Sequence, residues 1–221
     1  MNEEVLIPKM KRLEKKQRKI KIPLLNFVVV LFCTLLIIAS TFINIDLKHY
    51  TIPSSIFSKD LLSSADFICS FAIIPQIPIL MFNCSVVGKR MAITSTILYI
   101  ILGLIGLPIF ALGGGIRYFT EFSFGYILAY IPALVIAGNL LNSKYSIKNI
   151  LLAALFGTFT IHLLGMSYMT IIALLKHESA SFIWNWIGSQ SGIKIIYDII
   201  LSFTLMLIGK YLHSAFKFIL E

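Results

Sequence analysis

Asp198 is the residue of this 221-residue chain whose type and surroundings point most directly to chemistry. It interrupts a long apolar stretch, and a carboxylate inside a membrane is costly unless it is paired, hydrated or protonated. Such residues generally face the interior of a helix bundle and have a function, so we interpret Asp198 as a site residue. The alternative is that Asp198 lies about one turn inside the outer interface of the membrane and is simply hydrated.

Arg117 lies just after three consecutive glycines, Gly113, Gly114 and Gly115. Glycines let backbone N–H groups approach a ligand closely, and successive N–H groups can hold an anion. We therefore expect Gly114, Gly115 and Arg117 to contribute to a binding site, with Arg117 as the nearest candidate partner of Asp198 by topology. A plain loop charge at the membrane surface is the alternative for Arg117.

Gln76 and His162 are two further polar residues within apolar segments. Gln76 stands between Pro75 and Pro78, where its amide either binds polar groups of a substrate or pairs with carbonyls that the prolines release. His162 has Tyr168 close by. Its ring either titrates or donates to a ligand, or it has a hydrogen-bonded packing role.

The composition indicates which elements position these residues. Hydrophobic residues make up 58% of the chain and charged residues 13%, with a mean hydropathy of +0.90, whereas soluble domains carry about twice that charge. Apolar runs of the roughly 20 residues that span a bilayer recur along the chain, which excludes a secretory signal followed by a soluble domain. We predict an all-α integral membrane protein, a bundle of six transmembrane helices at residues 23–45, 67–88, 91–107, 122–141, 150–175 and 193–218.

The segments between these spans also carry predictions. Polar connectors are expected at residues 46–66 and 176–192, with Trp184 and Trp186 of the second as interface anchors. Pro75 and Pro78 are expected to kink or unwind the second span near mid-membrane, because proline breaks the helical hydrogen-bond pattern.

Basic residues predict the orientation of the chain. Residues 1–22 hold eight Lys and Arg residues, so we predict a basic cytoplasmic tail before a six-helix transmembrane substrate-binding domain at residues 23–221. With both termini inside (N-in/C-in), 14 of the 19 basic residues lie in the cytoplasm. The five outside are Lys48, Lys59, Arg117, Lys176 and Lys194. The net charge of +9 thus reflects membrane topology and not nucleic-acid binding.

Several motifs of catalysis are absent from the sequence. There is no GxxxxGK[ST] phosphate-binding loop, so we expect that any ATP hydrolysis belongs to partner chains. No HExxH or GxSxG motif occurs, and the three cysteines form no CxxC pair. We therefore expect no catalytic residues, no cofactor and no metal site.

One segment, from Gly88 to Gly115, reads GKRMAITSTILYIILGLIGLPIFALGGG and resembles the BioY family, the S components of energy-coupling-factor (ECF) transporters for biotin. A second segment, EFSFGYILAY at 121–130, is similar to that family's GPTGGYLLGF. It keeps Gly125 and Tyr126 and has Ser123 in place of threonine.

Three weaker matches accompany these two segments. Gln76 falls where the family has a glutamine, and IHLLGMSY at 161–168 looks like the family's IYLLGxxW. IIYDIIL at 195–201 looks like PGDLLK and keeps Asp198, but Leu201 stands where the family has a lysine.

The resemblance implies a six-helix S component that captures biotin from outside the cell. Delivery to the cytoplasm then requires a transmembrane T subunit and two ATPase subunits in the bacterial inner (cytoplasmic) membrane. Within the site, the resemblance implies that Asp198 or Gln76 contacts the ureido group of biotin. Aromatic rings then contact the thiophane ring, and Arg117 contacts the carboxylate. The full predicted substrate-binding set is Asp198, Arg117, Gln76, Gly114, Gly115, Ser123, Tyr126, Tyr130, His162 and Tyr168.

Two other classes of protein fit part of the pattern. A solitary proton- or ion-coupled carrier would use Asp198 and His162 as a titrating pair. A membrane-embedded enzyme acting on a lipid or lipid-linked substrate would use Asp198, His162 and Arg117, and would show a metal requirement or turnover.

Overall fold

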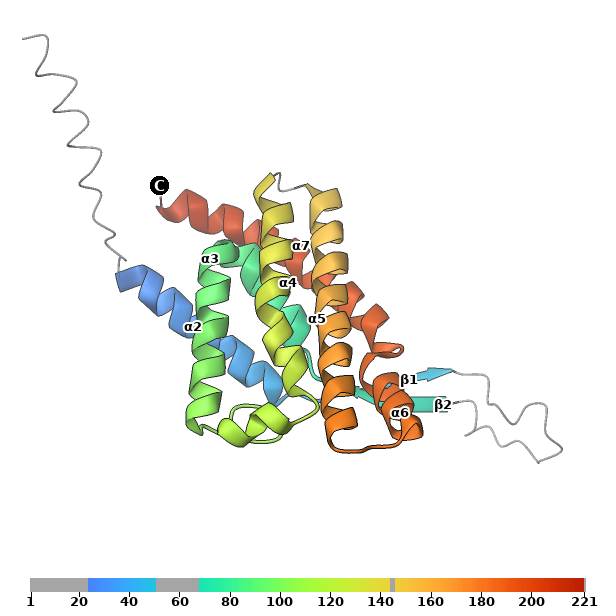
Figure 1. Ribbon diagram of the computed structural model, residues 1–221. Coiled ribbons are helices and arrows are strands. Elements are labelled where there is room, and N and C mark those ends of the chain that lie inside the picture. Colours follow the sequence, from blue (N-terminus) through green and yellow to red (C-terminus); the bar gives the residue numbers. More distant parts are fainter. Residues whose placement is uncertain (1–23, 51–67, 144–145, 221) are drawn as a thin grey trace, which may run out of the picture.

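The computed structural model describes residues 24–50, 68–143 and 146–220 (Figure 1). The predicted basic tail at 1–22 and most of the first predicted connector lie outside these ranges. The helices are α2 (Leu24–Thr41), α3 (Gln76–Ile105), α4 (Phe124–Ser143), α5 (Ile147–Leu175), α6 (Ala180–Ser191) and α7 (Lys194–Leu220), with a short 3-10 helix, η3 (Ile116–Thr120).

Five segments of the described chain are long and apolar enough to cross a membrane. They are Leu24–Thr41, Gln76–Ile105, Phe124–Asn142, Ile147–Leu175 and Ala180–Ala215. A chain with several such helices has the construction of a multi-pass membrane protein. The helices predicted at 23–45, 122–141, 150–175 and 193–218 are confirmed within a few residues as α2, α4, α5 and α7.

A two-stranded antiparallel sheet precedes α3, so the prediction of an all-α protein is wrong at this point. β1 (Ile45–Tyr50) pairs with β2 (Ile68–Ile73), with Ile45 opposite Ile73 and Tyr50 opposite Ile68. Residues 68–73 were predicted to begin the second span. Pro75 holds Ile74 out of the helical conformation, so the helix does not extend back into this segment. Pairing with β1 keeps residues 68–73 extended and satisfies their backbone groups.

Pro75 and Pro78 mark the start of α3 and do not kink it near mid-membrane, so that prediction is also wrong. The helix begins at Gln76, with Pro75 as its N-cap and Pro78 in its first turn. The first backbone N–H groups of a helix have no partner within the helix, so a proline without an N–H is tolerated there.

α3 instead folds back on itself at Gly88, which has φ 81° and ψ 167°. The Nε2 of Gln76 lies 2.7 Å from the hydroxyl of Tyr99, although a straight helix would separate residues 23 positions apart by about 34 Å. The two arms of α3 therefore run in opposite directions. This reversal agrees with the predicted turn between the second and third spans.

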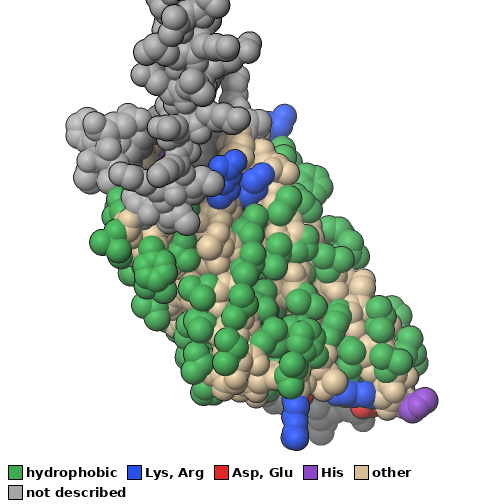
Figure 2. All heavy atoms as spheres, turned by 60° about the vertical axis from the view of Figure 1, so that its left-hand side comes forward, with side chains coloured by type: hydrophobic (Ala, Val, Ile, Leu, Met, Phe, Trp, Pro, Cys, Tyr) green, Lys and Arg blue, Asp and Glu red, His purple; other side chains and the backbone are tan. Residues whose placement is uncertain are grey.

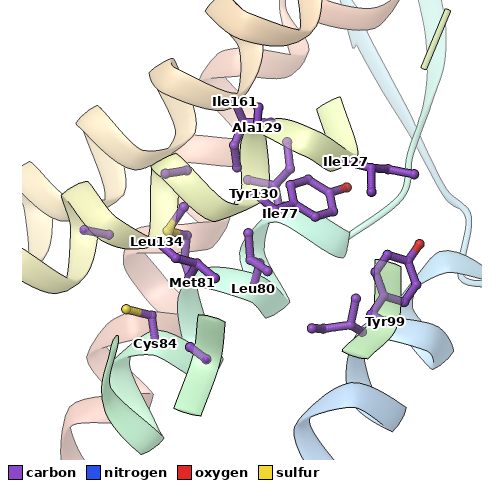
Figure 3. Packing of buried hydrophobic residues seen from close by; sticks show 14 of the residues in the cluster. Ile77, Leu80, Met81, Cys84, Tyr99, Ile127, Ala129, Tyr130, Leu134 and Ile161 are labelled. Carbon is purple, nitrogen blue, oxygen red and sulfur yellow. The ribbon is translucent and has the colours of Figure 1, made fainter. Parts of the chain in front are cut away.

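The hydrophobic core lies between both arms of α3 and helices α4 and α5, and it includes Ile37 of α2 and Met206 of α7. Figure 3 shows Met81 of α3 beside Leu134 of α4, both fully buried. α4 and α5 pack closely because a glycine on each helix faces a tyrosine on the other. A Cβ atom at Gly165 would lie 2.6 Å from the Tyr126 ring, and Gly125 faces Tyr168 in the same way.

The outer surface of the bundle is apolar between two charged ends. Figure 2 shows hydrophobic side chains over most of one face, with Lys and Arg side chains at its two ends. Leu24, Phe32 and Leu35 of α2 are each more than half exposed. Such a band fits contact with lipid chains, which are as apolar as these side chains.

Candidate functional site

A cavity of about 340 Å³ opens at one end of the bundle. Its walls come from the start of α3, the loop that leads to α4, and helices α4, α5, α6 and α7. Small-molecule sites have volumes of about 300 to 1,000 Å³, so this cavity suits a small ligand. Six of the predicted site residues line it: Gln76, Ser123, Tyr126, Tyr130, His162 and Asp198.

A chain of hydrogen-bonded side chains ends at the carboxylate of Asp198. Its Oδ2 lies 3.1 Å from Nε2 of His162, and Nδ1 of His162 lies 3.0 Å from the hydroxyl of Ser191. The Ser191 hydroxyl is in turn 2.5 Å from that of Tyr126. When Asp198 is ionised, all the donors of this hydrogen-bond network point toward it. The Tyr126 hydroxyl donates to Ser191, the Ser191 hydroxyl donates to Nδ1 of His162, and Nε2 of His162 donates to Oδ2 of Asp198.

The other carboxylate oxygen of Asp198, Oδ1, is buried and has no hydrogen-bond partner in the described part of the chain. Asp198 is only 3% exposed, so bulk water does not solvate it freely. A buried acceptor without a donor costs about 1 to 3 kcal/mol, and more when it is charged. Because Asp198 lies in the cavity wall, a ligand N–H is the group that would satisfy Oδ1.

Gln76 is paired through both ends of its amide. Nε2 donates to the hydroxyls of Thr41 and Tyr99, at 2.9 and 2.7 Å, and Oε1 accepts from the hydroxyl of Tyr130 at 2.8 Å. Figure 3 shows the hydroxyls of Tyr99 and Tyr130 on the same side of the hydrophobic cluster. Gln76 thus joins α2, α3 and α4 through side-chain hydroxyls, and not through carbonyls released by the prolines.

Four predicted site residues do not line the cavity. Arg117 is exposed in η3, and Asp198 is hydrogen-bonded to His162 instead. The N–H of Gly115 donates to the carbonyl of Gly103 at 2.7 Å, so it is not available to a ligand. Gly114 packs against the backbone of Leu107.

Tyr168, the fourth residue outside the cavity wall, donates its hydroxyl to the carbonyl of Phe119. Its ring lies 6.2 Å from that of Phe124. Tyr168 and the glycines therefore contact the loop that forms one wall of the cavity without lining the cavity themselves.

Six polar or aromatic residues of the cavity wall were not predicted as site residues: Tyr118, Glu121, Phe122, Trp186, Gln190 and Lys194. Trp186 and Gln190 belong to α6, which lies inside the predicted polar connector at 176–192. The Trp186 ring lies 5.9 Å from Tyr126 and 6.1 Å from Phe122. Trp186 is thus part of an aromatic wall, whereas Trp184 is 73% exposed.

The arrangement is suited to binding and less suited to catalysis. Ser191, His162 and Asp198 resemble a nucleophile, base and acid in order, but Ser191 is 1% exposed and is not in the cavity wall. Within residues 24–50, 68–143 and 146–220, no three His, Cys, Asp or Glu residues lie close enough to hold a metal ion. The cavity combines a buried acceptor, hydroxyl groups, aromatic rings and one lysine.

Three comparisons with known proteins agree with one another. The model of the BioY family matches residues 11–218. A protein of Lysinibacillus sphaericus named "Probable biotin transporter BioY" is 27% identical over 133 residues, which are 59% of this chain and 67% of that protein. The crystal structure of the S-component for biotin from an ECF-type ABC transporter matches with a TM-score of 0.61 at 20% identity, over 86% of this chain and 92% of that one. At this identity the structural match shows a shared fold.

Proposed function

Because the chain belongs to the BioY family, we propose that it is the substrate-binding S component of an ECF transporter and that it binds biotin. Two findings support this proposal: the similar Lysinibacillus sphaericus protein is named as a probable biotin transporter, and the similar solved structure is an S-component for biotin. The chain itself is a binding and translocation subunit and not an enzyme.

The observation that carries the proposal is the unpaired Oδ1 of Asp198 in the cavity wall. Biotin has a ureido group with N–H donors, an apolar thiophane ring and a carboxylate. An N–H of the ureido group would give Oδ1 the donor that it lacks among the described residues, and a hydrogen bond to a charged group is a strong one.

The remaining wall of the cavity is complementary to biotin. The rings of Tyr126, Phe122 and Trp186 offer apolar surface to the thiophane ring. The Tyr130 hydroxyl donates its hydrogen to Gln76, and this bond positions the hydroxyl. Its oxygen is therefore able to accept a hydrogen bond from a donor of the ligand. We therefore assign Asp198, Tyr126 and Tyr130 to direct contact with the ligand, while Gln76 and His162 hold them in place.

In the membrane, we propose six crossings with both termini in the cytoplasm. α2, the two arms of α3, α4, α5 and α7 supply the crossings, and Figure 1 draws the start of α2 and the end of α7 at the same end of the bundle. The cavity opens at the opposite end, which then faces outward. The location is the cytoplasmic (inner) membrane of a bacterium, where an outward cavity collects biotin from outside.

Energy for uphill uptake comes from partner chains in this proposal. The sequence has no GxxxxGK[ST] phosphate-binding loop. A T subunit and two ATPase subunits would dock on the chain within the bilayer and at its cytoplasmic end, and ATP hydrolysis there would drive release of biotin inside.

Calorimetric titration of the detergent-purified protein with biotin tests the proposed ligand. We expect tight one-to-one binding of biotin, and no binding of riboflavin, thiamine or lipoate, because none of these vitamins has the cyclic urea with two N–H donors that biotin offers to Asp198. A folded sample that ignores biotin but binds one of the other vitamins would reject biotin as the ligand.

A solitary proton-coupled carrier is the second candidate, and the 3.1 Å contact of His162 with Asp198 favours it. A buried histidine and carboxylate in contact can exchange a proton during transport. Uptake that persists without ATPase partners and collapses with the proton gradient would favour this carrier. Uptake that requires the ATPases would favour the S component.

A further inference from the structure

Lys194 is the only Lys or Arg, within the described part of the chain, that lines the cavity of Asp198. It is half-buried at the start of α7. Its Nζ lies 3.5 Å from Oε1 of Gln190, at the outer limit of a hydrogen bond. Among the described residues no carboxylate oxygen lies within 4.0 Å of Nζ of Lys194, so its charge is available to a ligand.

Lys194 and Asp198 lie on the same face of α7. Four residues correspond to about one turn and a rise of about 6 Å, so both side chains reach the same cavity from successive turns. The cavity therefore has a hydrogen-bond acceptor at Asp198 and a cation one turn nearer to the start of the helix.

The other charges of the cavity are unfavourable for an anion. Glu121 and Asp198 both line the wall, and carboxylates in a partly desolvated cavity repel an anionic ligand with little screening. Arg117 is exposed and lies outside the wall, so it does not offset this repulsion within the cavity. Lys194 supplies the positive charge that offsets this repulsion within the cavity.

We propose that Lys194 binds the carboxylate of the ligand, an inference that rests on the proposed function. The ligand then lies with its N–H donors at Oδ1 of Asp198 and its carboxylate toward the start of α7. The two residues together select a molecule with N–H donors at one end and a carboxylate at the other, and they fix its direction in the cavity.

The test is calorimetric titration with biotin and with biotinamide, whose side chain is neutral. The wild-type chain is expected to bind biotin about ten- to hundredfold more tightly than biotinamide, which is the range for a lost charged hydrogen bond. Lys194→Met is expected to lose the same factor for biotin and to bind the two molecules equally. Lys194→Arg, which keeps the charge, should keep the preference.

Two matched variants separate Lys194 from other cations. Lys148→Met removes an exposed lysine at the start of α5, outside the cavity wall, and should leave both affinities unchanged. Arg117→Gln removes the rival cation and should leave the preference for biotin intact. Loss of the preference in Arg117→Gln, or its persistence in Lys194→Met, would overturn the role of Lys194.

The proposal stays testable if Lys194→Met does not fold, which thermal unfolding would reveal. Equal affinity of the wild-type chain for biotin and biotinamide would overturn the inference without any variant, while the biotin site itself would stand. Absence of biotin binding by the wild-type chain would instead overturn the proposed function and, with it, this inference.

Discussion

At the residue scale, the two oxygens of the Asp198 carboxylate have different surroundings. Oδ2 is held by His162, whose ring is fixed on its other side by Ser191. Oδ1 is buried and has no partner among the described residues, although Asp198 itself lies in the cavity wall. The chain through His162 and Ser191 therefore fixes the carboxylate in one orientation before the ligand arrives, which lowers the entropy cost of binding.

Asp198→Asn tests this arrangement while keeping the size of the side chain. We expect biotin affinity to fall at least tenfold, or about 1.4 kcal/mol, because the charged acceptor at Oδ1 is lost. Calorimetry on the purified variant measures the change. Asp46→Asn on β1, which alters an exposed carboxylate outside the cavity wall, is the control and should bind as the wild type does. Unchanged affinity in a folded Asp198→Asn variant would remove Asp198 from the binding site.

At the element scale, the reversal of α3 at Gly88 brings the site together. Gln76 begins one arm and Tyr99 lies on the other, and their contact ties both arms to α2 through Thr41 and to α4 through Tyr130. The conformation of Gly88, with φ 81° and ψ 167°, is accessible to glycine and almost closed to other residues. The fold of the first half of the bundle thus depends on a single backbone position.

Gly88→Ala is expected to destabilise the protein by about 1 to 3 kcal/mol, the cost of holding a side chain in this backbone region. The strain is conformational and not steric, because no atom lies within 4 Å of the position of a new Cβ. Thermal or denaturant unfolding in detergent measures it. Gly188→Ala in α6, where a Cβ also meets nothing within 4 Å, is the control and should be neutral or slightly stabilising. Equal stability of both variants would show that Gly88 is not strained.

At the scale of the whole molecule, the bundle has two different ends. One end holds the cavity, η3, α6 and the β1–β2 sheet, and the other holds the end of α4 and the start of α5 (Figure 1). Gly88 lies at this second end, beside Leu141 and Asn142 of α4. α5 joins the two ends and, with 29 residues, is about 43 Å long, which exceeds the thickness of a bilayer core. Its two ends are therefore suited to report on the orientation of the protein.

Single cysteines at the ends of α5 test the proposed orientation. Lys148 and Lys176 are both exposed, and each would be replaced by cysteine in a variant without Cys33, Cys69 and Cys84. With both termini inside, a membrane-impermeant maleimide should label Lys176→Cys on intact cells and Lys148→Cys only after permeabilisation. The reverse pattern would contradict the orientation, and labelling of both on intact cells would contradict a crossing by α5.

The sequence by itself determined the class of the protein, the positions of most helices and six residues of the cavity wall. These features depend on local signals: apolar length, a carboxylate in an apolar segment, and short family-like motifs. The sequence predicted helix ends less well where contact with a distant segment of the chain decides the local backbone conformation. Residues 68–73 are apolar enough for a span, but Pro75 keeps Ile74 out of the helix, and pairing with β1 makes residues 68–73 a strand.

Only the tertiary structure decided which polar groups meet. The predicted membrane topology suggested Arg117 as the partner of Asp198, whereas packing of α5 against α7 brings His162 to it. The BioY-like pattern has a lysine three residues after Asp198, where this chain has Leu201. Lys194 is seven residues, or about two turns, before Leu201 and so lies on nearly the same face of α7. The spacing of residues along a helix predicts which of them share one face of that helix. The cavity, however, is formed by several helices, so its position depends on how those helices pack.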